Sequence, residues 1–235
     1  MFGYYYGFDL SYLVLVVPAI LLGLWAQARV QSTYARYSRV RAVRGITADQ
    51  VARRILDANG LRDVSIQRIA GSLTDHYDPR ERVVRLSETV YGSPSIAAIG
   101  VAAHEVGHAV QHATGYAPLK LRTAIVSVTN IGSTLSMPLI LIGILLNSSR
   151  LALVGVALFG LVAVFQLVTL PVEFNASSRA LATLDGMDIL GREELGGARQ
   201  VLTAAALTYV AALIQSLAQL LRLLLLVGGN RRRGD

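Results

Sequence analysis

Four long apolar stretches interrupt an otherwise polar sequence and predict membrane-spanning helices. They are Leu10–Ala28, Thr123–Ser149, Leu151–Val172 and Gln200–Leu221, and each contains 19 to 27 residues without a charge. One helical crossing of a bilayer needs about 20 predominantly apolar residues, so all four are long enough. The pattern therefore predicts a mainly α-helical, polytopic membrane bundle.

The first and fourth stretches have features of their own. The first ends in Ala26-Gln27-Ala28, which is typical of a signal-peptidase site, but no Lys or Arg precedes its apolar core. We therefore favour a retained anchor over a cleaved signal peptide. In the fourth, polar residues recur on one helical face, which favours contact with protein rather than lipid. They are Thr208, Gln215, Gln219 and Arg222.

Between the first two stretches, shorter patterns predict a small α+β portion. Thr47–Asn59 is expected to be a helix, with Thr47 and Gln50 as a capping box and Gly60 as its stop. Two strands are expected at Val64–Ile69 and Arg82–Leu86, joined as a hairpin by a turn at Tyr77-Asp78-Pro79-Arg80. Ser93-Pro94 is expected to open the next helix.

Composition agrees with a membrane protein. Hydrophobic residues make up 53% of the 235 residues and charged residues 16%, against roughly 25% charged in a soluble domain. These values exclude a disordered or purely soluble chain. The absence of cysteine excludes a disulfide framework, a thiolate zinc site and a cysteine nucleophile.

The net charge of +7 comes from 21 Arg and one Lys against 15 acidic residues. The arginines cluster beside the apolar stretches, which favours the cytoplasmic membrane face, and we expect no nucleic-acid partner. Because several arginines follow the first stretch and none precedes it, the N-terminus is expected outside and residues 29–122 in the cytoplasm. Arg231–Arg233 fit only if the fourth stretch is re-entrant or interfacial, or if the rule fails at this tail.

The helix after Ser93-Pro94 contains the motif His104-Glu105-Val106-Gly107-His108. Residues four apart on a helix lie one above the other, so both imidazoles point to one place and suit Zn²⁺. Glu105 is turned about 100° from His104 and can act as general base on a zinc-activated water. We therefore predict His104 and His108 as metal ligands and Glu105 as the catalytic residue.

A third zinc ligand is needed, and Glu173 is the strongest candidate. It lies at the mouth of a predicted span, where a carboxylate is costly unless it has a partner. Two crossings separate it from His108, so both residues would lie on the same side of the membrane. His112 is about 12 Å along the helix from His104 and is interpreted as exposed or hydrogen-bonded. His76 stays open as a ligand or substrate contact.

Three segments resemble the YugP-like bacterial membrane neutral zinc metallopeptidases. They are His104–Gln111, the preceding Tyr77–Arg80 with Arg85–Ser87, and Leu170–Phe174. The resemblance covers nearly the whole chain and implies a zinc endopeptidase distantly related to the HtpX and CAAX-prenyl membrane proteases. In those relatives a Glu from a later helix completes the site, which supports Glu173.

Two positions depart from the patterns that the resemblance implies. The distant relatives have an acidic residue four positions after the ligand Glu, where this chain has Ser177. The orientation of the ligands must then be secured differently. Asn175 stands where Asp is usual, which argues against a proton-accepting role at that position.

The resulting interpretation is a membrane-embedded zinc endopeptidase of the HExxH, gluzincin type that holds one Zn²⁺ and hydrolyses protein or peptide substrates. Its fold is expected to be a helical membrane bundle with a small α+β, zincin-like cytoplasmic portion. We divide the chain into an N-terminal anchor (1–28), the metallopeptidase portion (29–122), a transmembrane hairpin (123–172), and a third-ligand helix with a C-terminal membrane-associated helix (173–235).

Two other interpretations stay open. The first is a catalytically silent membrane scaffold or chaperone, against which the intact Glu105 argues. The second is a transporter with a polar path lined by helices, which the polar face of the fourth stretch favours. The strand Arg82–Leu86 is expected either to border the cleft as an edge strand that holds extended substrate or to be an ordinary amphipathic strand with its arginines outward. Candidates to stabilise the oxyanion are His76, Tyr77, Tyr91 and Arg179. An oligomeric or regulatory partner in the membrane is not readable from the sequence.

Overall fold

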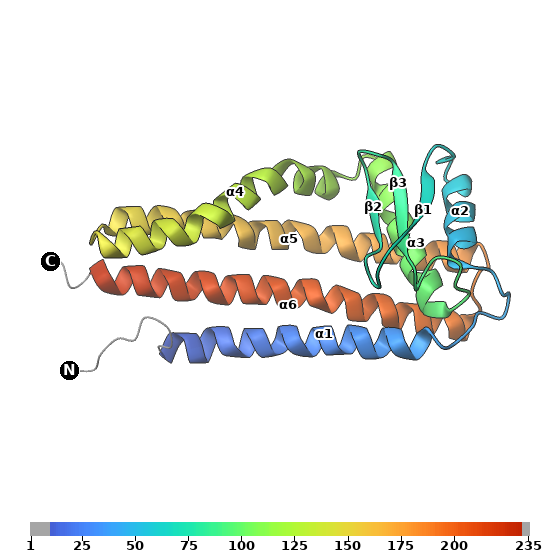
Figure 1. The fold of residues 1–235 in the computed structure, drawn as a ribbon, viewed down its shortest axis with the longest axis horizontal. Helices are drawn as coiled ribbons and strands as arrows, with labels where there is room; N and C mark the ends of the chain where they lie inside the picture. Colours follow the sequence, from blue (N-terminus) through green and yellow to red (C-terminus); the bar gives the residue numbers. More distant parts are fainter. Residues whose placement is uncertain (1–9, 232–235) are drawn as a thin grey trace. The chain divides into compact units, whose positions relative to one another are not determined.

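The computed structural model describes residues 10–231, which form six α-helices and one three-stranded sheet (Figure 1). A π-helical stretch, Tyr12–Val16, leads directly into the first α-helix. In chain order the elements are α1 (Val17–Tyr37), α2 (Ala48–Ala58), β1 (Ser65–Ile69), β2 (His76–Asp78), β3 (Val83–Ser87), α3 (Ile96–Ala113), α4 (Ala117–Leu145), α5 (Ser149–Gly186) and α6 (Arg192–Arg231).

The chain divides into two compact units, which we call the span unit and the site unit. Among the described residues, the span unit comprises residues 10–26, 121–170 and 208–231. The site unit comprises Gln27–Lys120 and Pro171–Leu207. Each unit is described below by itself.

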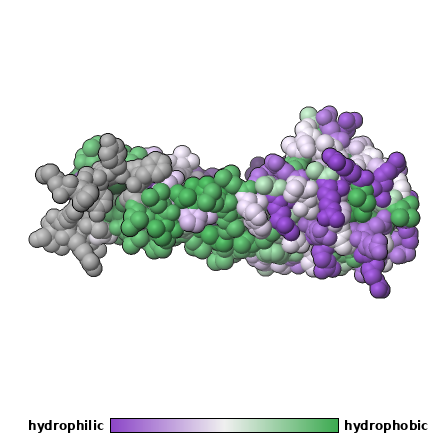
Figure 2. Space-filling view, turned by 90° about the horizontal axis from the view of Figure 1, so that it is seen from below, coloured by the Kyte–Doolittle hydropathy of each residue, from purple (hydrophilic) through white to green (hydrophobic). Residues whose placement is uncertain are grey.

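Four helices within residues 10–231 are long and apolar enough to cross a bilayer. They are Tyr12–Tyr37, Ala117–Leu145, Ser149–Gly186 and Arg192–Gly228. Each overlaps one predicted stretch, and the fold is mainly α and polytopic, as predicted. The surface seen in Figure 2 is largely hydrophobic over the span unit, whereas hydrophilic side chains gather over the site unit. Lipid-facing side chains account for this difference, because the bilayer interior has no water to solvate polar groups.

The span unit is held together by small residues and aliphatic side chains from α4, α5 and α6. Gly143 of α4 lies so close to α5 that an added Cβ would come within 2.4 Å of the Ala152 backbone nitrogen. Ile140, Val156 and Leu223 belong to the same buried cluster. Small residues allow such close backbone approach, which is a common basis of helix association in lipid.

The predicted polar face of α6 is only partly turned toward protein. The Arg222 side chain is buried, and its guanidinium lies over the ring of Tyr12 at 5.0 Å. Gln215, on the same predicted face, is exposed. α6 is uninterrupted over the described residues, from Arg192 to Arg231. The side chains of Arg231–Arg233 lie outside the described part.

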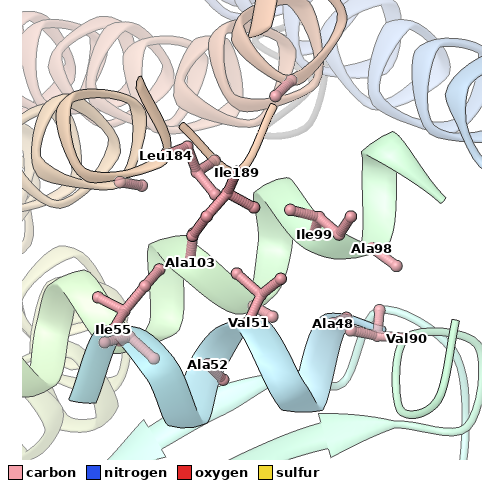
Figure 3. Packing of buried hydrophobic residues seen from close by; sticks show 14 of the residues in the cluster. Ala48, Val51, Ala52, Ile55, Val90, Ala98, Ile99, Ala103, Leu184 and Ile189 are labelled. Atoms are coloured by element: carbon pink, nitrogen blue, oxygen red, sulfur yellow. The ribbon is translucent and has the colours of Figure 1, made fainter. Parts of the chain in front are cut away.

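The core of the site unit forms where α2 packs on α3 (Figure 3). Val51 and Ile55 of α2 face Ile99 and Ala103 of α3, and Leu184 of α5 closes the cluster from the other side. The capping of α2 is as predicted: Gln50 Oε1 accepts from the Thr47 backbone N–H at 3.3 Å. Gly60 follows the helix with φ +73°, a conformation that favours glycine.

The three-stranded sheet corrects the predicted hairpin. β1 pairs with β3 in parallel and β2 pairs with β3 antiparallel, so the order is β1-β3-β2. Tyr77 and Asp78, expected in a turn, belong to β2, because the chain reverses only after Asp78. The strand predicted to be an edge strand is β3, and it is central. The prediction that β3 offers a free edge to substrate is wrong. The edge strands of this sheet are β1 and β2.

The helix of the motif begins two residues later than predicted. Its N-cap is Ser95, whose side-chain oxygen accepts from the Ala98 N–H at 3.2 Å. The Pro94 carbonyl accepts from Ala42 N–H, and the Ile96 N–H donates to the Val40 carbonyl. These bonds hold the Ser93–Ser95 segment extended against the chain after α1, so the helix cannot begin at Ser93.

Candidate metal centre

His104 and His108 lie one turn apart on α3, as the motif predicts. Their ring centroids are 4.7 Å apart, and the rings meet edge to face at 84°. The two side chains are 15% and 12% exposed, so they open toward a partly accessible space. Successive turns of one helix thus present two nitrogen donors to the same point.

Glu173 of α5 meets both histidines. Its Oε2 lies 3.3 Å from His104 Nε2 and 3.5 Å from His108 Nε2, and its side chain is 3% exposed. One donor atom from each of the three residues lies within 4.8 Å of the others. The structure thus brings together the three residues that the sequence reasoning selected as ligands.

The donor set fits a zinc ion. Two imidazole nitrogens and one carboxylate oxygen are a common three-ligand set for zinc sites that keep a position open for water. A tetrahedral ion with bonds of about 2.0–2.2 Å places its ligand atoms about 3.3–3.5 Å apart. The two distances from Glu173 to the histidine nitrogens lie in this range. Two of the three distances between donor atoms thus match those around a tetrahedral zinc ion, and all three donor atoms lie within 4.8 Å of one another.

Glycine at position 107 explains how α5 comes close enough. A Cβ on Gly107 would lie 2.7 Å from the Ala176 backbone oxygen of α5, closer than real Cβ contacts. Gly107 lies inside the motif, between the histidines, so the two backbones touch at the level of the ligands. Pro171 does not end α5, which continues through the ligand position to Gly186.

The electrostatics at His108 favour a cation. Burial alone would lower the pKa of its imidazole, because burial disfavours the charged form. A hydrogen bond to Glu173 and the negative charges of Glu105 and Glu173 outweigh burial and raise the pKa of His108. The same negative charges would favour a divalent cation that competes with the proton for this nitrogen.

Each of the two histidines has a neutral partner for its other ring nitrogen. His104 Nδ1 lies 3.1 Å from Ser177 Oγ, and His108 Nδ1 lies 3.0 Å from Gln111 Oε1. Position 177 thus has a hydroxyl where the distant relatives have an acidic group. The sequence reasoning did not assign a role to Gln111. Its position, three residues after His108 on the same helix, was the available signal.

The other candidates lie outside this cluster. Glu105 is half-buried beside the ligands and acts on His108 through its charge. His112 Nδ1 lies 2.9 Å from the Tyr77 hydroxyl, which agrees with its interpretation as a hydrogen-bonded histidine. His76 Nδ1 faces the Thr74 carbonyl at 2.9 Å, and His76 is not part of the three-residue group. Arg179 Nε donates to Asn175 Oδ1 at 2.8 Å.

Within residues 10–231, four membrane-length helices and a group of three side chains that could hold one metal ion are the features of a membrane metalloprotein. The chain belongs to the family described as "Putative neutral zinc metallopeptidase", whose model matches residues 12–228. It is also 50% identical over 220 residues to the "Putative membrane protease YugP" of Bacillus subtilis (strain 168). The aligned region covers 94% of this chain and 98% of that protein. No solved structure gives a significant match.

Family membership confirms the resemblance seen in the sequence. The chain is a multi-pass membrane protein of a zinc metallopeptidase family, and zinc is its metal. His104, His108 and Glu173 are a group that could hold one such ion. A peptidase family implies a protein or peptide substrate.

Proposed function

We propose that this chain is a membrane endopeptidase of the gluzincin type, in which His104, His108 and Glu173 hold one zinc ion and Glu105 is the general base. The observation that carries the proposal is the meeting of three donor atoms from α3 and α5 within 4.8 Å. The chemistry of the donor set and the family membership both support zinc.

Zinc, when bound, supplies a Lewis acid that polarises a carbonyl and makes water more acidic. The residues of the protein hold the zinc ion in place and transfer protons. Glu173 and the two imidazoles lie on the facing sides of α5 and α3 and are largely removed from water, which keeps their geometry fixed. Preorganised charge of this kind needs little rearrangement during the reaction.

Glu105 is the residue that accepts and then donates the proton in the proposed reaction. It follows His104 directly, so its side chain points about 100° away from the ligand face and stays available. Its carboxylate accepts a proton from the attacking water as the water oxygen bonds to the scissile carbonyl carbon. It then donates that proton to the amide nitrogen as the carbon–nitrogen bond breaks. The products are a carboxylic acid and an amine, and the remaining proton of the acid passes to the amine or to solvent, which leaves a carboxylate.

We also propose the orientation in the membrane. The N-terminus would lie outside and the site unit in the cytoplasm, because five arginines follow the first span closely. They are Arg29, Arg36, Arg39, Arg41 and Arg44. Clustered arginines at a span end favour the cytoplasmic face.

The test of the function is Glu105→Gln in the full-length protein purified in detergent. We expect it to retain zinc and to lose most cleavage of an unfolded, fluorescently labelled protein, by about 100-fold or more, because general base catalysis contributes 10²–10⁴-fold. Glu193→Gln, an exposed glutamate in the first turn of α6, is the matched control and should cleave like wild type. Wild-type cleavage by Glu105→Gln would contradict the mechanism. Zinc-bound wild type without any cleavage would favour a silent scaffold.

A further inference from the structure

Gln111 is a completely buried amide next to a proposed metal ligand. Its residue exposure is 0%, and it lies on α3 one turn after His108. Its Oε1 faces His108 Nδ1 at 3.0 Å, while its Nε2 faces the Val172 carbonyl at 2.8 Å and Asn175 Oδ1 at 3.0 Å. A completely buried amide cannot form hydrogen bonds with bulk water, so each of its contacts must pair a donor with an acceptor.

The orientation of this amide is fixed from two sides. The Val172 carbonyl can only accept a hydrogen bond, so the Gln111 atom that faces it must be the NH₂ group. Asn175 gives the same answer independently. The Arg179 guanidinium has donors only, and its Nε donates to Asn175 Oδ1 at 2.8 Å. That atom of Asn175 is therefore an acceptor, and it again requires the NH₂ group of Gln111.

The orientation of the Gln111 amide determines which nitrogen of His108 carries the hydrogen. With its NH₂ group on α5, Gln111 presents its carbonyl oxygen to His108, so His108 Nδ1 must carry the hydrogen. A neutral imidazole has one N–H, which leaves a lone pair on Nε2. Nε2 is the atom that lies 3.5 Å from Glu173 Oε2. The buried network thus selects the His108 tautomer that can bind a metal through Nε2.

We propose that Gln111 is a positioning residue that fixes the tautomer and ring orientation of His108 and also ties α3 to the ligand position of α5. The second role follows because Val172, which accepts from Gln111, directly precedes Glu173. This inference rests on the proposed metal site. Partners of the second ring nitrogen orient ligand histidines and raise their basicity, and their loss costs about 10–100-fold in metal affinity or activity.

The experiment compares two substitutions of Gln111 in the full-length protein. Gln111→Met keeps the volume but removes both hydrogen-bonding roles. Gln111→Glu keeps an acceptor for His108 Nδ1 and removes the donors to α5. We expect zinc to bind about 10–100-fold more weakly to Gln111→Met, and Gln111→Glu to lie between that variant and wild type. Gln67→Leu, an exposed glutamine of β1, is the control and should bind zinc like wild type.

A second readout separates positioning from a loss of folding. Cobalt(II) bound in place of zinc reports ligand geometry through its visible absorption bands. We expect altered bands in cobalt-loaded Gln111→Met and bands closer to wild type in Gln111→Glu. Wild-type affinity and bands in Gln111→Met would overturn the role of Gln111. Equal defects in both variants would overturn the acceptor role toward His108.

A third variant distinguishes failure of this inference from failure of the metal site. His108→Ala should lose nearly all zinc. Retention of wild-type zinc affinity by His108→Ala would overturn the site itself, and the Gln111 inference with it. Loss of zinc in His108→Ala together with wild-type affinity in Gln111→Met would overturn the Gln111 inference alone.

Discussion

The two histidines that we propose as ligands differ in how firmly their second ring nitrogen is held. His108 faces a buried amide whose orientation has one consistent solution, whereas His104 faces the hydroxyl of Ser177 at 3.1 Å. A hydroxyl can rotate and can donate or accept, so it does not by itself select a tautomer. We therefore assign the more specific constraint to His108.

A prediction at the residue scale follows for Ser177→Ala. We expect zinc affinity to fall by less than about tenfold, because the partly exposed His104 can take a water in place of the hydroxyl. Zinc competition with a chelator of known affinity measures this. Ser178→Ala, the exposed neighbour on α5, should have no effect. A larger loss for Ser177→Ala than for Gln111→Met would reverse this ranking.

The meeting of the three proposed ligands could be predicted from sequence, but the partners of these residues could not. Helical spacing alone predicts that His104 and His108 share one face, and the number of expected crossings predicts that Glu173 lies on the same side of the membrane. The contacts of Gln111 with Val172 and Asn175 depend on the packing of α3 against α5. No local pattern encodes that packing, so the bonds from Gln111 to α5 appear only in the structure.

At the scale of elements, the contact between α3 and α5 determines whether Glu173 lies close enough to His104 and His108 to share a metal ion with them. The backbones touch at Gly107 and Ala176, in the turn between the two histidines. A side chain at position 107 must push α5 away, because the neighbouring atom is a backbone oxygen and cannot rotate aside. Gly107 is therefore part of what positions Glu173.

We predict that Gly107→Ala destabilises the protein and weakens zinc binding, despite the better helix propensity of alanine. Overpacking of this kind costs about 1–3 kcal/mol. Gly100→Ala is the matched control on the same helix, because its added Cβ would meet Ala198 Cβ at an ordinary 3.5 Å. Unfolding midpoints (Tm) of the zinc-free proteins should fall for Gly107→Ala and stay level or rise for Gly100→Ala. Equal Tm values for Gly107→Ala and wild type would contradict the close contact.

The long elements followed from sequence better than the short ones. Spans of about 20 apolar residues and the capping box at Thr47 have strong local signals. β2 has three residues, too few for an alternating pattern, and the parallel pairing of β1 with β3 brings together segments that no turn signal joins. Ser93 and Ser95 are both suitable N-cap residues. The helix begins after Ser95 because backbone hydrogen bonds join Pro94 to Ala42 and Ile96 to Val40.

At the scale of the whole molecule, the proposed topology can be tested by labelling because the chain has no cysteine. Ser72→Cys lies in the exposed loop between β1 and β2, and Ser149→Cys lies at the start of α5. In intact cells, a membrane-impermeant maleimide should label Ser149→Cys and reach Ser72→Cys only after the membrane is permeabilised. The reverse labelling pattern would contradict the cytoplasmic location of the site unit.

The central claim is that two imidazoles of α3 and one carboxylate of α5 hold the same zinc ion. The most direct measurement is the zinc content of purified wild type, Glu173→Ala and the control Glu193→Ala. We predict about one zinc per chain in wild type and in the control, and loss of most of it in Glu173→Ala, because two remaining protein ligands are one fewer than catalytic zinc sites use. A full equivalent of zinc in Glu173→Ala would contradict the claim.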